Sequence, residues 1–202
     1  MSKALVITLG GRKYPALNLQ KALRKIGMQW RKNARISLTK QKRNNTGNLS
    51  KSIGLIVGQD KDGFFVDITP SAPYWPFVDL GVQGASYNKF GSVQAKSPFK
   101  FGKSAGKKRS PNGLRSAIDR WTVQKNIKGT RDEQGRFVPR ESIVQAISRG
   151  IWYGGLKPSL FISGTGDRIE KKATKQIGIA LEKDYANAMK KDMSRDKNLK
   201  VT

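Results

Sequence analysis

The residues that could carry catalytic chemistry are few in kind. The 202-residue chain holds 14 Asp and Glu but no His and no Cys. Without those two residue types, Ser-His-Asp and Cys-His catalysis, histidine acid–base chemistry and nearly all zinc sites are excluded. Asp60 and Asp62 have the spacing of a metal loop, but the rest of a calcium-loop pattern is missing and Asp is common in turns. We therefore expect no enzyme activity, no cofactor and no bound metal.

A phosphate-binding motif and a nuclease site are matched only in part. Residues 164–168, GTGDR, precede an expected helix but lack the lysine and the spacing of a P-loop, so a plain helix start is the simpler interpretation. The acid–lysine runs IEKK and LEKD lie on a charged helix without the clustered acids that a nuclease needs. Binding or assembly is therefore a better hypothesis than catalysis.

Positive charge dominates the sequence. The chain has 40 Lys and Arg and a formal charge of +26, and residues 1–59 contain thirteen of these cations and no acid. Residues 86–110 contain seven more, again without an acid. Such a surface needs a polyanion, an acidic partner or counterions, and nucleic acid is the first candidate.

The first basic region coincides with an amphipathic helix that we predict over residues 18–40, with Asn18 as its cap. Apolar residues recur at helical spacing between Leu19 and Ala34, and cations fill the remaining arc. A solvated face would explain this arc equally well. The residues predicted to contact DNA or an acidic partner are Lys21, Arg24, Lys25, Arg31, Lys32 and Arg35.

The second basic region, residues 86–110, has no sustained period and is rich in Gly, Ser and Lys. We predict a long basic loop or docking arm that a partner orders. Its rings, interleaved with lysines, could stack on bases, or the arm could simply be solvated. The residues assigned to the arm are Lys89, Phe90, Lys96, Phe99, Lys100, Phe101 and Lys103.

The patterns along the chain predict an α+β fold, in which helices flank a small antiparallel β-sheet. A short strand ends at Gly10 and Gly11, and a hairpin covers residues 53–68. Helices are expected from Pro111, before Gly154, and over a long C-terminal stretch from about Asp167 to Met193. The length favours a single domain over 1–202. No apolar run suits a membrane span or signal peptide, so we expect a soluble intracellular protein.

The stretch APYWPFVDLGVQG, residues 72–84, gathers aromatic rings and one acid between prolines and glycines. Its prolines predict a sharp turn after the hairpin that presents Tyr74 and Trp75. The segment could pack under the sheet, with Asp79 paired to a nearby Lys. It could equally form a patch that another chain covers, and composition leaves both interpretations open.

The order of these motifs resembles a known family. TGNLSKSI (residues 46–53), a hairpin and then PYWPFVDLGV (residues 73–82) are similar to the signatures of the neck and tail-completion family of tailed bacteriophages, which includes minor tail proteins. LRSAIDRWTVQKNI and SIVQAISRGIWYGGLKPSLF also resemble longer members, so the resemblance covers about residues 18–190. The chain departs from the family pattern in having Asp79 where Glu is usual, Leu80 for an aromatic residue and Val82 for Thr.

The resemblance implies a structural virion protein that forms a sixfold or twelvefold ring at the head–tail junction, around the DNA channel. Its partners would be head-completion or connector proteins, tail-terminator or tail-tube proteins, and double-stranded DNA held without sequence preference. It would be made in the host cytoplasm. The alternative is a free nucleic-acid-binding protein of ribosomal or packaging type. The residues predicted to form the subunit interface are Tyr74, Trp75, Phe77, Asp79 and Leu80.

Overall fold

The computed structural model describes residues 5–85, 97–102, 112–127, 129, 131 and 133–199. The chain divides into two compact units: unit 1 comprises Met1–Pro73 with Leu160–Thr202, and unit 2 comprises Tyr74–Ser159. Helices and two-stranded antiparallel sheets confirm the α+β class and the long C-terminal helix, although the strands form two separate hairpins in place of one sheet. That 1–202 works as one neck domain stays a prediction.

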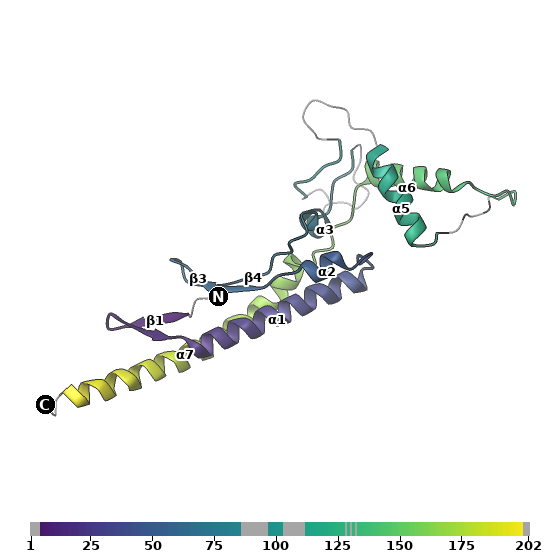
Figure 1. Ribbon diagram of the computed structural model, residues 1–202. Helices are drawn as coiled ribbons and strands as arrows, with labels where there is room; N and C mark the ends of the chain where they lie inside the picture. The colour runs from purple at the N-terminus through teal and green to yellow at the C-terminus, as the bar shows by residue number, and fades with distance from the viewer. Residues whose placement is uncertain are drawn as a thin grey trace. The chain divides into compact units, whose positions relative to one another are not determined.

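Unit 1 (Figure 1) consists of two hairpins and two long helices, with one short helix between them. Its elements are β1 (Val6–Leu9), β2 (Arg12–Pro15), α1 (Leu17–Lys40), α2 (Asn48–Ser52), β3 (Ile56–Gln59), β4 (Phe64–Asp67) and α7 (Ser163–Leu199). Unit 2 contains α3 (Trp75–Leu80), α5 (Asn112–Gln124) and α6 (Arg140–Gly154).

The two hairpins of unit 1 follow from their turn residues. Gly10 and Gly11 both have positive φ and join β1 to β2, a second strand that the sequence pattern did not predict. The predicted 53–68 hairpin is confirmed as β3 and β4. Its turn is closed by Asp60, whose Oδ1 accepts hydrogen bonds from the N–H groups of Asp62 and Gly63, both at 2.9 Å. This confirms the interpretation of these acids as turn residues.

The core of unit 1 lies where α1 packs along α7 (Figure 1). A cluster of buried side chains joins the first hairpin to both helices: Leu5, Ile7, Tyr14, Ala16, Leu19, Leu23 and Ala188. The predicted Asn18 cap is wrong, because Asn18 lies inside the first turn of α1. The cap comes instead from α7: the buried Asp184 carboxylate accepts hydrogen bonds from the N–H groups of Asn18 at 3.0 Å and Leu19 at 2.8 Å.

Two further contacts bring the hairpins onto the helices. Gly27 of α1 allows β3 and β4 to approach closely, since a Cβ there would lie 2.3 Å from Leu55 and 3.0 Å from Val66. Gln59 joins the hairpins: its amide accepts from the Val6 N–H at 3.0 Å and donates to the Val6 carbonyl at 3.1 Å. The side chain thereby replaces a backbone pairing between β3 and β1.

Unit 2 is organised around the segment that follows α3. Val82 pairs with Leu156, and Gln83 pairs in parallel with Lys100, so residues 82–83 lie between two other segments of the chain. α5 and α6 pack against one another in the same unit. Both helices were predicted, and between them Arg131 pairs with Phe137 across the turn at Gly135.

The C-terminal helix starts four residues before the predicted boundary, at Ser163 instead of Asp167. GTGDR therefore lies within its first turns, and the Gly164 and Gly166 N–H groups donate to the carbonyls of Leu160 and Ile162. The segment therefore lies inside the helix, whereas we had expected it to precede the helix. Its Gly164 and Gly166 N–H groups are already paired with backbone carbonyls. None of the helices in the described ranges combines the length and apolarity needed to span a membrane.

Candidate functional site

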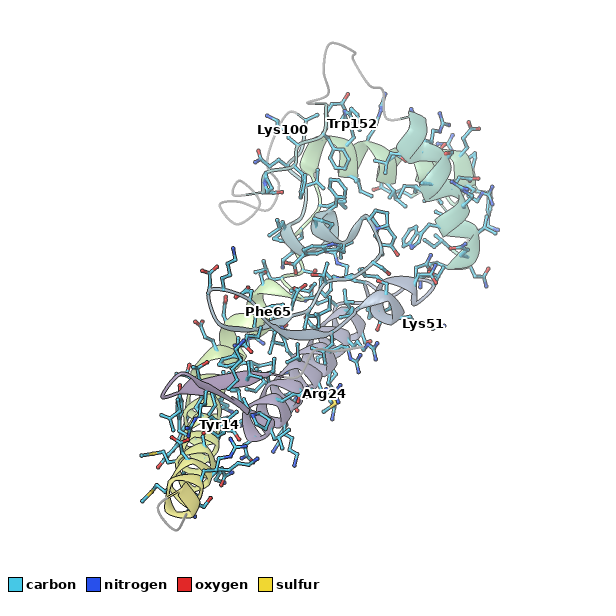
Figure 2. All side chains as sticks on the ribbon, turned by 60° about the vertical axis from the view of Figure 1, so that its left-hand side comes forward. Tyr14, Arg24, Lys51, Phe65, Lys100 and Trp152 are labelled. Carbon is cyan, nitrogen blue, oxygen red and sulfur yellow. The ribbon has the colours of Figure 1, made fainter. Side chains whose placement is uncertain are left out.

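The six cations predicted on the first helix form one surface, which we call the basic arc: Lys21, Arg24, Lys25, Arg31, Lys32 and Arg35. With 3.6 residues per turn they fall within roughly 120° of the circumference of α1. Figure 2 shows Arg24 on the outer edge of α1, while Tyr14 lies towards α7. The six residues thus lie on one side of the helix, and Lys21 lies close enough to α7 to line a pocket with Asp184 and Lys191.

The members of the basic arc differ in exposure. Lys21, Arg24, Lys25 and Lys32 are exposed, whereas Arg31 and Arg35 are half-buried. The Arg35 guanidinium donates through Nε to the Ser50 carbonyl at 2.9 Å, which ties α1 to α2. The four exposed cations are therefore those free to meet an external anion, and Arg35 has a structural contact as well.

Acids are absent from the whole first region of the sequence, so no carboxylate on α1 neutralises the basic arc. The positive charge continues past the helix end through Lys42 and Arg43. Burial lowers the pKa of Arg43, although an arginine stays protonated at any physiological pH. A negatively charged partner would meet a surface whose charged side chains are all cationic.

Apolar residues, which were not predicted on this surface, share it with the cations. Met28 lies near the centre of the basic arc and is 51% exposed, and Leu17 at the start of α1 is 55% exposed. A helical projection of the sequence places Met28 there, because it lies four residues from Arg24 and from Lys32. The surface is thus cationic with an apolar centre.

The five residues of the predicted subunit interface, which we call the seam segment, lie at or within α3 (Tyr74, Trp75, Phe77, Asp79 and Leu80). The chain turns at Pro73 and Tyr74, as expected, and a short helix follows, with Pro76 in its first turn, where proline is tolerated. Tyr74 and Phe77 are exposed, Trp75 and Leu80 are half-buried, and Asp79 is buried within the subunit. The exposed rings are thus the part of the segment that a neighbour could cover, and its interface role stays a prediction.

The seam segment meets the start of the predicted docking arm. The rings of Phe77 and Phe99 have centroids 4.4 Å apart, and those of Phe101 and Trp152 lie 5.4 Å apart. The Phe101 N–H donates to the Gln83 carbonyl, and Gln83 N–H to the Phe99 carbonyl. Lys100 is exposed between them (Figure 2). Phe99 and Phe101 are therefore packed inside unit 2.

The remaining residues assigned to the arm lie outside the described residues: Lys89, Phe90, Lys96 and Lys103. Its base is described at residues 97–102, where the buried Ser97 donates through Oγ to the Gly81 carbonyl at 2.8 Å. The docking role of this arm stays a prediction.

The motif at residues 46–53, on which the family resemblance partly rests, has a structural role in unit 1. Gly47 has φ +76° at the start of α2, a left-handed conformation that suits glycine. Leu49 and Ile53 are buried, and Ser52 donates to the Leu49 carbonyl at 2.9 Å. These residues fix the corner between α2 and β3.

Residues 17–81, which contain the basic arc and the seam segment, match the model of a protein family described as "Bacteriophage HK97-gp10, putative tail-component". Over these residues the chain is similar to the HK97-gp10-like family. The resemblance seen in the sequence is thereby confirmed over this range, and its extension to residues 82–190 stays a prediction. No curated protein and no solved structure matches the chain significantly.

The family match points to a bacteriophage tail component. Within the described ranges, no group of three or more acidic side chains is arranged to hold a metal ion. What the arrangement offers is a cationic helix face and a pair of exposed rings, both of which suit assembly contacts.

Proposed function

We propose that the protein is a structural subunit of a tailed-bacteriophage particle that forms a ring at the head–tail junction, around the channel through which DNA passes. One observation supports the proposal most directly: residues 17–81, which match the family model, contain both the basic arc and the seam segment. A subunit of this kind acts by binding and needs no catalytic residue. We expect sixfold or twelvefold symmetry and contacts with head-completion and tail proteins.

The seam segment suits the contact between neighbouring subunits. Exposed aromatic rings dominate the energetics of protein interfaces, and Tyr74 and Phe77 are exposed beside the buried Asp79. In a ring the same subunit offers two different surfaces, one to each neighbour. The rings of this segment would be one of them.

The basic arc suits the surface that faces DNA. Phosphate contacts position nucleic acid without carrying sequence information, as a channel requires. Four exposed cations per subunit, multiplied by the symmetry of the ring, create a strong field although each subunit contributes little. DNA affinity should be insensitive to sequence and fall steeply with salt, with a log–log slope of about −0.9 per phosphate neutralised.

A specific observation favours a second partner for the same surface. Met28, exposed in the centre of the basic arc, would be buried by an acidic head or tail protein but not by a phosphate backbone. The free nucleic-acid-binding protein stays the broader alternative. It would be monomeric, bind RNA or DNA tightly at low salt and be absent from particles.

Charge reversal on the basic arc tests these roles. Lys21→Glu with Lys25→Glu should leave the fold intact, because both side chains are exposed, and should loosen DNA retention in assembled particles. The control is Lys172→Glu with Lys175→Glu, an exposed pair on α7 with the same change of charge. Mutant particles that hold DNA as firmly as the control particles would contradict the channel role of the arc.

A second variant separates DNA from a protein partner. Met28→Gln keeps every charge of the basic arc and removes its apolar centre. If an acidic protein covers the arc, Met28→Gln should reduce incorporation into particles, as measured by quantitative mass spectrometry of purified virions. If DNA is the partner, incorporation and DNA retention should both match the wild type. A wild-type protein that never enters particles would reject the virion role itself.

A further inference from the structure

Unit 1 contains an apolar groove that neither the basic arc nor the seam segment includes. It has a volume of about 510 Å³ and opens between α1, β4 and the first half of α7. Two exposed acids, Asp167 and Glu170, also line it. The apolar residues that line it include Ile26, Trp30, Val66, Ile169, Ala173 and Ile177.

The wall of this groove is fixed before anything binds. The Trp30 indole donates through Nε1 to the Ile162 carbonyl and to the Thr165 hydroxyl, both at 3.1 Å. A Cβ at Gly166 would lie 2.8 Å from the indole, so this glycine lets the ring lie against α7. A groove held in shape by hydrogen bonds and close packing binds with little loss of conformational freedom.

The acids specify the chemistry of the occupant. An apolar groove bordered by Asp167 and Glu170 suits an apolar anchor with cations beside it. With a formal charge of +26, the chain itself is rich in such neighbours, so a second copy has the right composition. The occupant must also be exposed and held in a defined shape.

Phe137 in unit 2 has these properties. It is 66% exposed, the largest exposed fraction among the large hydrophobic side chains of the described residues, and Arg136 beside it is exposed too. Its backbone pairs with Arg131 across the Gly135 turn, where φ is +77°. A Cβ at Gly129 would clash with the Phe137 ring, so the ring can pack against the backbone there only because residue 129 is glycine.

We infer that the α1–β4–α7 groove of one copy receives Phe137 of a second copy. The groove and the anchor are different surfaces, so the contact is head to tail, the type that closes into rings. The inference rests on the proposed ring and adds a contact that would hold it together. Arg136 would lie near Asp167 and Glu170 of the partner and fix the direction of entry.

Two variants that disable opposite halves of the contact test it. Ala173→Trp fills the groove and keeps the anchor, whereas Phe137→Ser removes the anchor and keeps the groove. Loss of a buried aromatic anchor should weaken self-association by about 30-fold or more, measured by sedimentation velocity. Each variant alone should therefore fail to form rings. Their mixture should form a dimer with one copy of each, because that pair retains one intact groove and one intact anchor.

Matched controls separate this contact from general damage. Ile179→Trp adds a ring to an exposed position of α7 outside the groove, and Val123→Ser removes an exposed apolar side chain of unit 2. Both should assemble as the wild type does. Circular dichroism and thermal melting should show all four variants folded. If Ala173→Trp unfolds, the double variant Glu170→Lys with Asp167→Lys replaces it as the groove variant. This double variant should weaken self-association, as Phe137→Ser does.

The failures of the groove contact and of the ring can be told apart. If the wild-type protein forms rings and both variants form them equally well, the groove contact is overturned and the proposed ring stands. A wild-type protein that stays monomeric and is absent from particles would overturn both. A photo-cross-linker at position 173 that captures a different virion protein in particles, and never this chain, would overturn the second copy as the occupant.

Discussion

Unit 1 and unit 2 bury different kinds of side chain. In the described part of unit 1 the buried residues are mainly apolar and include large ones such as Leu19, Leu38 and Phe161. In the described part of unit 2 the buried hydrophobic side chains are Val82 and Val144. Apart from Pro158, the other buried side chains there are polar or charged: Asp79, Ser97, Thr122, Ser148 and Ser159.

The buried hydroxyl groups of unit 2 all donate to backbone carbonyls. Ser159 reaches Val78 and Ser148 reaches Val144, both at 2.7 Å, and Thr122 reaches Asp119 at the same distance. Such bonds satisfy the polar groups but contribute less than apolar burial does. Unit 1 therefore has a core that stabilises it alone, whereas unit 2 depends on backbone geometry and leaves Tyr74, Phe77 and Phe137 exposed for partners.

Gly81→Ala is the strongest test of this dependence on backbone geometry. Gly81 has φ +73°, and a Cβ there would lie 2.5 Å from the Leu156 carbonyl oxygen and 2.8 Å from Pro158 N. Positive φ and the forced backbone shift should together lower the stability of unit 2 by about 3–5 kcal/mol. Hydrogen exchange should then show the Val82 and Gln83 amides losing protection while those of Leu19 and Leu23 keep theirs.

Equal loss of protection in both units would contradict this separation. It would mean that the two units unfold cooperatively and that the contrast in their cores has no consequence for stability. Gly150→Ala is the control, because a Cβ at this helical glycine meets nothing within 4 Å.

Asp184→Ala should be the most damaging single change among the polar ties of unit 1. The buried carboxylate accepts three hydrogen bonds from Asn18 and Leu19, and its loss leaves backbone donors of α1 unpaired. The free energy of unfolding should fall by about 2–4 kcal/mol in urea titration. Asp184→Asn retains one acceptor oxygen and should cost less. A helix cap typically contributes about 1 kcal/mol. A decrease in the free energy of unfolding below about 0.5 kcal/mol would therefore show that α1 needs no cap from α7.

The contrast between the units also explains what the sequence could predict. Helices, the 53–68 hairpin and the basic arc come from local periodicity, which a single segment reveals. The Asp184 cap joins residues 166 positions apart, and no residue pattern near Asn18 predicts it. β2 was missed because RKYP shows no apolar alternation. The groove was missed because its walls come from three separate elements.

The first hairpin of unit 1 should loosen at both extremes of pH. Hydrogen bonds from Tyr14 and Arg12 lower the pKa of Asp192, and the bond to Asp192 raises the pKa of Tyr14. Stability from a lowered carboxyl pKa is present above the unfolded value, near 4, and is lost as pH falls through the folded pKa. Stability from a raised phenol pKa is present below about 10 and is lost as pH rises through the folded pKa.

Hydrogen exchange or amide chemical shifts of Ile7 and Thr8, followed against pH, measure both transitions. Tyr14→Phe should abolish the alkaline transition and Asp192→Asn the acidic one. The effect should stay local, because Tyr14 Oη and Arg12 Nη1 each meet the same Asp192 oxygen at 2.6 Å in a partly exposed site. Acidic loosening that persists in Asp192→Asn would assign the transition to another carboxylate.

The smallest expected effect concerns the ion pairs between α5 and α6 in unit 2. Arg115 Nη2 lies 2.6 Å from Glu141 Oε1, and Arg140 Nη2 lies 3.0 Å from Asp119 Oδ1, but all four side chains are exposed. Exposed pairs contribute little because water and salt screen them. Arg115→Gln, which keeps most of the side-chain stem, should change the stability of unit 2 by less than about 0.5 kcal/mol. A loss above 1 kcal/mol that disappears in high salt would show that these charges, and not backbone geometry, hold unit 2 together.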